Sequence, residues 1–260
     1  MAAREGTGAA VRLAPTRATS GLLWPLNALV EGLGRARGFL CHPTAARRER
    51  EARAFEALCE ALNLGTARDV EALAEGFRQS LRPHHTQYAA CVSPAWMTIS
   101  LELAAFLQAL CARRRPARVV DLGSGFSSFA LRQYQLQANP APEVWSVDDD
   151  DRWLNATRRF LEYHHLATDH LALWDTFIAD EPGRFDLVVH DLGSLRVRRE
   201  TLRQVVALAA PGGIVVIDDV NYGGFRRYAQ RTLADLGAPH HMLEAATRDC
   251  FGRYAMLVAP

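Results

Sequence analysis

Hydrophobic residues recur at helical spacing through the first third of the chain, before a different pattern begins. This periodicity predicts helices over residues 45–63 and 67–81. Residues 82–86 break the second helix with a proline and two histidines. Pro94, directly after a serine, predicts the start of a long apolar helix over residues 94–110. The chain up to about residue 115 is therefore expected to be helical.

From residue 118 onward, short apolar runs alternate with helical segments. Strands are predicted at 118–122, 143–147, 171–174, 186–190, 214–217, 241–246 and 254–259. Helices are predicted at 126–136, 151–165, 197–209 and 222–236. The runs 187–189 and 214–217 are continuously apolar, which is typical of strands covered on both faces.

The pattern predicts the α/β class: a doubly wound, Rossmann-like, seven-stranded sheet with a helical N-terminal extension. The last strand follows its predecessor after a short turn near residues 249–252, so it is expected to be antiparallel, in a C-terminal hairpin.

Length and composition set the domain organisation. The 260 residues, 49% of them hydrophobic, suffice for one α/β domain and an extension. We expect a disordered tail over residues 1–18, a helical cap over 19–115 and a ligand-binding domain over 116–260.

The net charge of +1 and the absence of a basic stripe argue against a nucleic-acid partner. No apolar run reaches the roughly 20 residues that span a bilayer, so no membrane partner is expected. Five scattered cysteines without metal-ligand spacing fit reduced thiols, and we expect a cytoplasmic protein. All 30 basic residues are arginine, so no lysine can act as a base.

A glycine turn follows the strand at 118–122. Asp121, Gly123, Ser124, Gly125 and Ser127 form a strand end, a tight turn and the start of a helix. Glycines allow a ligand to approach the backbone, and the helix start offers free N–H groups to an anion. Asp121 has the chemistry to accept hydrogen bonds from a ligand or from its own loop. A plain strand-to-helix turn would give the same pattern.

An acid lies at or just after the end of each of the first five predicted strands. These acids are Asp121, Asp148, Asp175, Asp191 and the pair Asp218 and Asp219. Each alone has the alternative interpretation of a helix cap, which is less plausible for all five. A carboxylate after the second strand suits a ribose diol, because it accepts from both hydroxyls. Asp149 adjoins this candidate, while Asp150 or Asp151 is expected to cap the next helix.

These segments, with the strand Val144–Asp148 and the run 211–217, resemble the class I S-adenosylmethionine-dependent methyltransferases over about residues 93–260. The resemblance implies that residues 116–260 bind S-adenosylmethionine. It places Gly123, Ser124 and Gly125 beside the methionine part, Asp148 at the ribose and Asp175 at the adenine. A nicotinamide enzyme is the competing interpretation, but it favours a third glycine where Ser128 stands.

Within that family the chain is similar to the metal-assisted O-methyltransferases. The resemblance implies a Mg²⁺ or Mn²⁺ site formed by Asp191, Asp218 and Asp219, whose oxygens suit a hard cation. Two features depart from the pattern: Ser194 stands where catechol-type relatives carry lysine, and His190 precedes the acid. Caps and turns without a metal are the alternative for these three acids.

Candidate catalytic residues are His84, His85, His190 and Asp191. A histidine near neutral pKa suits a general base, and the first two are expected in a loop that folds over the cofactor. An ordinary surface histidine pair is the alternative for them.

The sequence therefore predicts an enzyme that transfers a methyl group from S-adenosylmethionine to a small-molecule acceptor, at a hydroxyl oxygen. Two alternatives remain: a metal-independent N-methyltransferase of a small molecule or peptide, and a non-catalytic cofactor-binding partner subunit that docks through residues 20–39. The N-terminal helices are candidates for a homodimer contact.

Overall fold

The computed structural model describes residues 32–33, 36 and 44–260. The predicted tail over residues 1–18 and most of the predicted docking segment over residues 20–39 lie outside these residues. All elements below belong to the described part of the chain.

Seven strands form one sheet in the order β3-β2-β1-β4-β5-β7-β6. They are β1 (Arg118–Leu122), β2 (Glu143–Asp148), β3 (Leu171–Leu173), β4 (Phe185–His190), β5 (Ala209–Ile217), β6 (His240–Met242) and β7 (Met256–Val258). Strand β7 runs antiparallel to both β5 and β6, and the other neighbouring pairs are parallel. The predicted doubly wound sheet with an antiparallel last strand is confirmed.

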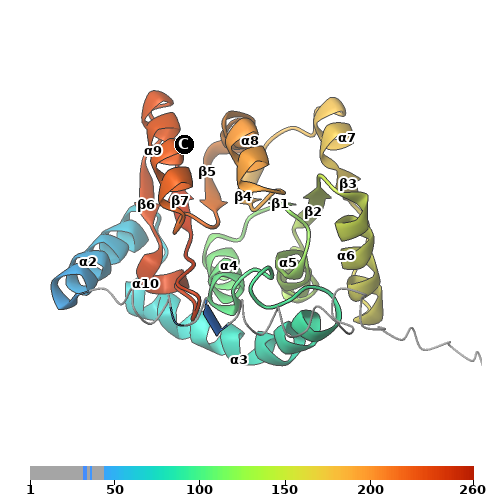
Figure 1. Ribbon diagram of the computed structural model, residues 1–260, viewed down its shortest axis with the longest axis horizontal. Helices are drawn as coiled ribbons and strands as arrows, with labels where there is room; N and C mark the ends of the chain where they lie inside the picture. The colour runs from blue at the N-terminus through green and yellow to red at the C-terminus, as the bar shows by residue number, and fades with distance from the viewer. Residues whose placement is uncertain (1–31, 34–35, 37–43) are drawn as a thin grey trace, which may run out of the picture.

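Helices cover both faces of the sheet (Figure 1). They are α2 (Ala45–Ala61), α3 (Ala67–Cys91), α4 (Leu101–Arg114), α5 (Phe126–Gln137), α6 (Asp151–Tyr163), α7 (Trp174–Ala179), α8 (Leu195–Ala207), α9 (Gly223–Asp235) and α10 (Glu244–Thr247). In Figure 1, α4 and α5 lie below the sheet with α3 running beneath them, and α7, α8 and α9 lie above.

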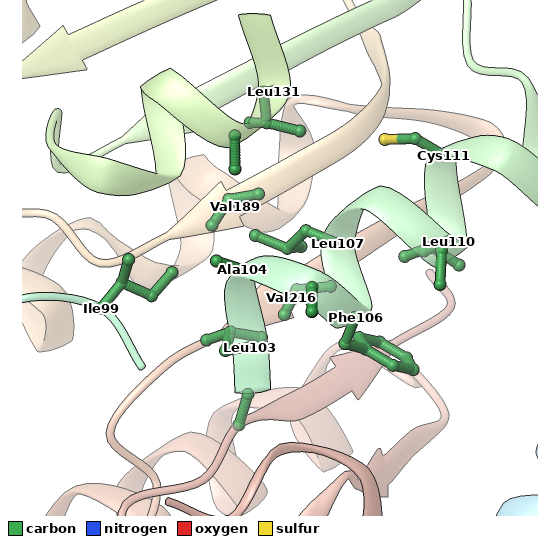
Figure 2. Packing of buried hydrophobic residues seen from close by; sticks show 14 of the residues in the cluster. Ile99, Leu103, Ala104, Phe106, Leu107, Leu110, Cys111, Leu131, Val189 and Val216 are labelled. Atoms are coloured by element: carbon green, nitrogen blue, oxygen red, sulfur yellow. The ribbon is translucent and has the colours of Figure 1, made fainter. Parts of the chain in front are cut away.

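The strands place alternate side chains into two separate cores. Val119 and Val189 belong to the core between the sheet and helices α4 and α5. Their neighbours Val120 and Val188 belong to the core between the sheet and helices α8 and α9. Figure 2 shows Leu107 of α4 beside Val189 in the first core. Burial on both faces explains the continuously apolar strands in the sequence.

Helix α3 differs from the prediction, because it continues through Pro83 to Cys91. Leu81 and Tyr88 lie on either side of the proline and are both buried in the core. Packing on both sides of the proline therefore outweighs the backbone hydrogen bond that a proline removes. The predicted loop at residues 82–86 is wrong.

The next helix also begins later than predicted. Ser100 caps α4, accepting a hydrogen bond of 3.0 Å from the Leu103 amide. Residues 92–100 form an irregular segment, tightened where the Thr98 hydroxyl donates to the carbonyl of Ser93 at 2.9 Å. This segment, called the 92–100 loop below, positions one wall of the site. No helix in the described residues is long and apolar enough to cross a membrane.

Candidate functional site

A cavity of about 500 Å³ opens at the carboxyl ends of the parallel strands. Its walls come from the glycine turn, the ends of β2, β4 and β5, and the 92–100 loop. The lining includes Tyr88, Trp96, Met97, Gly123, Ser124, Gly125, Ser127, Asp148, Asp149, Trp153, Asp191, Arg198, Asp218, Asp219, Tyr222 and Arg253. Segments far apart in sequence therefore share one chamber at the edge where α/β sheets bind ligands.

Gly123 is required by the geometry of the glycine turn. Its φ is +104°, and a Cβ atom there would lie 2.3 Å from the carbonyl oxygen of Asp191. Only glycine fits such a position without moving the neighbouring strand end. Gly123 therefore lets the turn pack directly against the backbone at the end of β4.

Asp121 is buried beneath the turn and holds it. Its Oδ2 accepts hydrogen bonds from the hydroxyls of Ser127 at 2.8 Å and Ser128 at 2.6 Å. Burial raises the pKa of Asp121 to about 7. The other carboxylate oxygen, Oδ1, is buried and has no hydrogen-bond partner in the protein. Asp121 therefore supports its own loop from beneath the cavity wall.

Asp148 ends β2 and lines the cavity with only 4% of its surface exposed. Its Oδ2 accepts a hydrogen bond of 2.8 Å from the Ser124 hydroxyl, and its Oδ1 accepts one of 3.1 Å from the Asp150 amide. Burial raises the pKa of Asp148 to about 6. The glycine turn and the second strand end are thereby joined into one polar surface.

The neighbouring acids have separate roles. Asp149 lines the cavity, and its carboxylate lies against Gly193, where a Cβ atom would be 2.3 Å from Oδ2. Asp150 caps α6, accepting from the Arg152 amide at 2.9 Å. Asp175 is exposed in the first turn of α7 and is not on the cavity wall. The adenine contact expected of Asp175 therefore finds no support in this arrangement.

Asp191, Asp218 and Asp219 meet at the cavity, as predicted. Strand β5 ends at Ile217, so both following acids lie in the loop. Asp219 adopts a left-handed conformation, with a φ of +59°, and its amide donates to Asp218 Oδ1 at 2.6 Å. This turn lets two successive residues line the same cavity, which they could not do within a strand.

The predicted metal site is not shown, and Arg198 stands between two of its acids. Its Nη2 forms an ion pair with Asp191, and its Nη1 lies 2.9 Å from Asp219 Oδ2. No group of three histidine, cysteine or acidic side chains in the described residues is arranged to hold a metal ion. The residues do not fit the divalent ion that the resemblance implied.

Burial strongly affects the charges of this cluster. Desolvation, and then the nearby Asp219 and Asp191, raise the pKa of Asp218 well above its ordinary value. Desolvation also raises the pKa of Asp191, although Arg198 opposes this effect. Carboxyl groups of this kind are able to hold a proton near neutral pH.

The three candidate histidines are not among the residues that line the cavity, so the prediction of a histidine base gains no support from it. His84 lies on α3 against Phe129, with ring centroids 5.0 Å apart. His85 donates a hydrogen bond of 2.9 Å to the carbonyl of Ile99. His190 is fully buried, and its Nε2 donates to the carbonyl of Arg198 at 3.1 Å. Burial lowers the pKa of His190 to about 3. Only Asp191 of the four catalytic candidates reaches the cavity.

Two lining arginines, Arg198 and Arg253, were not among the predicted site residues. Arg253 precedes β7, pairs with Asp249 at 2.7 Å and donates to the carbonyl of Trp96 at 3.0 Å. The sequence carries no local signal for this contact. A signal for Arg198 does exist, because Leu202 and Val205 follow it at helical spacing and mark the same buried face.

Solved structures share this fold. Cofactor-bound Rv0187 from MTB matches with a TM-score of 0.54 and 20% identity, over 69% of this chain and 88% of that one. An O-methyltransferase from Bacillus cereus in complex with SAH matches with a TM-score of 0.54 and 16% identity, over 69% and 90%. The O-methyltransferase TomG from Streptomyces achromogenes, in complex with SAM, matches with a TM-score of 0.50 and 17% identity, over 82% and 97%.

No protein-family profile matches the chain, and no curated relative matches it by sequence. The predicted resemblance to class I S-adenosylmethionine-dependent methyltransferases is confirmed at the level of the fold.

Proposed function

We propose that this chain, which has the class I methyltransferase fold, transfers a methyl group from S-adenosylmethionine to a hydroxyl oxygen of a small-molecule acceptor. One observation carries the proposal: a single cavity joins the glycine turn and Asp148 to the cluster of Asp191, Asp218 and Arg198. Structures with the same fold, described as O-methyltransferases in complex with SAH or SAM, support both the cofactor and the oxygen acceptor.

The first part of the cavity has the chemistry to hold the cofactor. Asp148 presents a buried carboxylate to a ribose diol, and Ser124 already orients it. Asp121 supports this wall from below, because its Oδ2 accepts from the hydroxyls of Ser127 and Ser128 in the glycine turn. Gly123 and Gly125 leave the backbone free of Cβ atoms along the same wall.

The second part of the cavity has the chemistry to bind and orient an acceptor. S-adenosylmethionine supplies an electrophilic methyl group, whose bond to sulfur breaks, with the electron pair returning to sulfur, as the acceptor oxygen bonds the carbon. Asp218 and Asp191 line this region, and their raised pKa values let either carboxyl hold the hydroxyl proton near neutral pH. Trp96, Met97 and Tyr222 supply an apolar wall. Orientation of the acceptor is then the main contribution of the protein.

Nitrogen methylation is the second candidate, and one observation favours it. On the acceptor side three carboxylates, Asp191, Asp218 and Asp219, face two guanidinium groups, Arg198 and Arg253. An amine, which binds as a cation and must lose a proton before it reacts, would pair with the ionised form of these carboxyl groups.

A product assay tests these proposals together. The protein is incubated with S-adenosylmethionine and, separately, with phenols, aliphatic alcohols and amines, and products are identified by mass spectrometry. The proposal predicts S-adenosylhomocysteine together with an O-methylated product. N-methylated products alone would favour the second candidate. Cofactor binding without any methylated product across the panel would favour a non-catalytic subunit.

A further inference from the structure

Arg198 holds the centre of the acid cluster through three contacts. Nη2 pairs with the Asp191 carboxylate and lies 3.3 Å from the carbonyl oxygen of Gly193. Nη1 pairs with Asp219 at 2.9 Å. The residue is only 7% exposed, so these are interactions within a buried site. The guanidinium therefore fixes the positions of two cavity-lining acids.

The backbone of Arg198 is held as firmly as its side chain. It lies in the first turn of α8, where its amide donates to the carbonyl of Ser194 at 2.9 Å. Its own carbonyl accepts a hydrogen bond from the fully buried His190. Because its backbone and its guanidinium are both held, Arg198 keeps one position, whereas a surface arginine samples several partners.

The charge of Arg198 takes the role that a divalent ion would have at this position. A guanidinium stays ionised at all relevant pH values and matches carboxylates with a planar set of donors. A metal ion would need the oxygens of Asp191 and Asp219 that Arg198 already uses. A metal ion bound there would leave the buried guanidinium without its carboxylate partners. An unpaired charge that is shielded from water is unfavourable.

We propose that Arg198 is the resident cation of the acceptor pocket, and that methyl transfer by this chain needs no divalent metal. This inference rests on the proposed function. Arg198 acts as a positioning residue, since it orients Asp191 and Asp219. It also bears on the acceptor class. A metal ion would favour acceptors with two neighbouring hydroxyl groups, because both oxygens can chelate it. Without the metal ion, the pocket also accepts molecules with a single hydroxyl or amine.

A Mn²⁺ titration of the full chain tests the proposal. Free Mn²⁺ is measured by electron paramagnetic resonance in the presence of saturating S-adenosylhomocysteine, whose binding is measured first by calorimetry. The wild type is compared with Arg198→Met, which keeps an apolar stem but removes the cation. The matched control is Arg196→Met, because Arg196 lies in the same helical turn but pairs with Glu200 on the surface, at 2.8 Å.

The proposal predicts no stoichiometric Mn²⁺ binding by the wild type or Arg196→Met up to about 1 mM, the weak end of protein sites for hard cations. It predicts that Arg198→Met binds Mn²⁺ at least about tenfold more tightly than the wild type. One equivalent of Mn²⁺ bound to the wild type overturns the inference. So does a folded Arg198→Met that binds S-adenosylhomocysteine but gains no Mn²⁺ affinity.

Two further outcomes are distinguishable. If Arg198→Met fails to fold, the wild-type titration alone decides, by the same criterion. If the wild type does not bind S-adenosylhomocysteine in the first step, the proposed function fails as well, whatever the Mn²⁺ result.

Discussion

The guanidinium of Arg253 donates a hydrogen bond of 3.0 Å to the main-chain carbonyl of Trp96, 157 residues earlier in the chain. A second hydrogen bond, of 3.3 Å, reaches the carbonyl of Ala95. Asp249 orients the same guanidinium from the segment before β7. Arg253 thus ties the 92–100 loop, which forms the apolar wall of the cavity, to the last hairpin of the sheet.

Removing this tie should affect the acceptor more than the cofactor. Arg253→Met leaves two loop carbonyls without their donor, and we expect the KM for the acceptor to rise by about tenfold, the effect of roughly 1.4 kcal/mol. Affinity for S-adenosylhomocysteine, measured by calorimetry, should change much less, since Asp148 and the glycine turn are untouched. Arg231→Met, at an exposed position of α9, is the control. Equal losses for acceptor and cofactor would contradict the assignment of the loop.

Replacing the glycine at position 123 should destabilise the folded protein. Gly123→Ala places a Cβ atom 2.3 Å from the carbonyl oxygen of Asp191, at a φ of +104°. We expect unfolding in denaturant to show a loss of stability of at least about 2 kcal/mol, from strain and overpacking together.

A matched glycine-to-alanine substitution in α3 should have the opposite effect on stability. Gly76 has no heavy atom within 4 Å of the position its Cβ would take. Gly76→Ala should stabilise the protein by about 0.5–1 kcal/mol, because alanine favours a helix interior. Similar effects of the two substitutions would show that the turn is not as constrained as described.

The buried carboxyl of Asp121 should make stability depend on pH. Burial raises its pKa to about 7 from 3.8, so the folded protein holds a proton there that the unfolded chain has lost. Stability from this group is therefore lost as the pH rises through that interval. Asp121→Asn removes the dependence, so the stability of this variant relative to the wild type should increase from pH 5 to pH 8. A constant difference between the two, in denaturant unfolding at each pH, would refute the shift.

The sheet was predictable because its signals are local. Strand β1 begins and ends at the predicted residues. The continuous apolar runs correctly indicated strands that are buried on both faces. The acids at strand ends were predictable for the same reason, since parallel strands bring their carboxyl ends to one edge. Hence Asp148, Asp191 and Asp218 all lie at the cavity.

The remaining features depend on tertiary contacts that local sequence does not encode. Pro83 predicted a break, but the burial of Leu81 and Tyr88 keeps α3 continuous and holds His84 and His85 away from the cavity. In α8, helical spacing marks Arg198 as the buried arginine beside the exposed Arg196 and Arg199, but its pairing with Asp191 and Asp219 depends on the tertiary fold. The metal prediction counted three acids without the arginine that pairs with two of them, Asp191 and Asp219.

Calorimetric titration of the full chain with S-adenosylhomocysteine tests the central claim most directly. We predict binding of one equivalent by the wild type and a loss of about 1–3 kcal/mol in binding free energy for Asp148→Asn. This substitution disturbs the carboxylate that accepts from Ser124 and that we propose as the ribose acceptor. Asp151→Asn, at an exposed site in the first turn of α6, should bind like the wild type. Absence of binding by the wild type, or equal binding by all three proteins, would contradict the assignment of this cavity as the cofactor site.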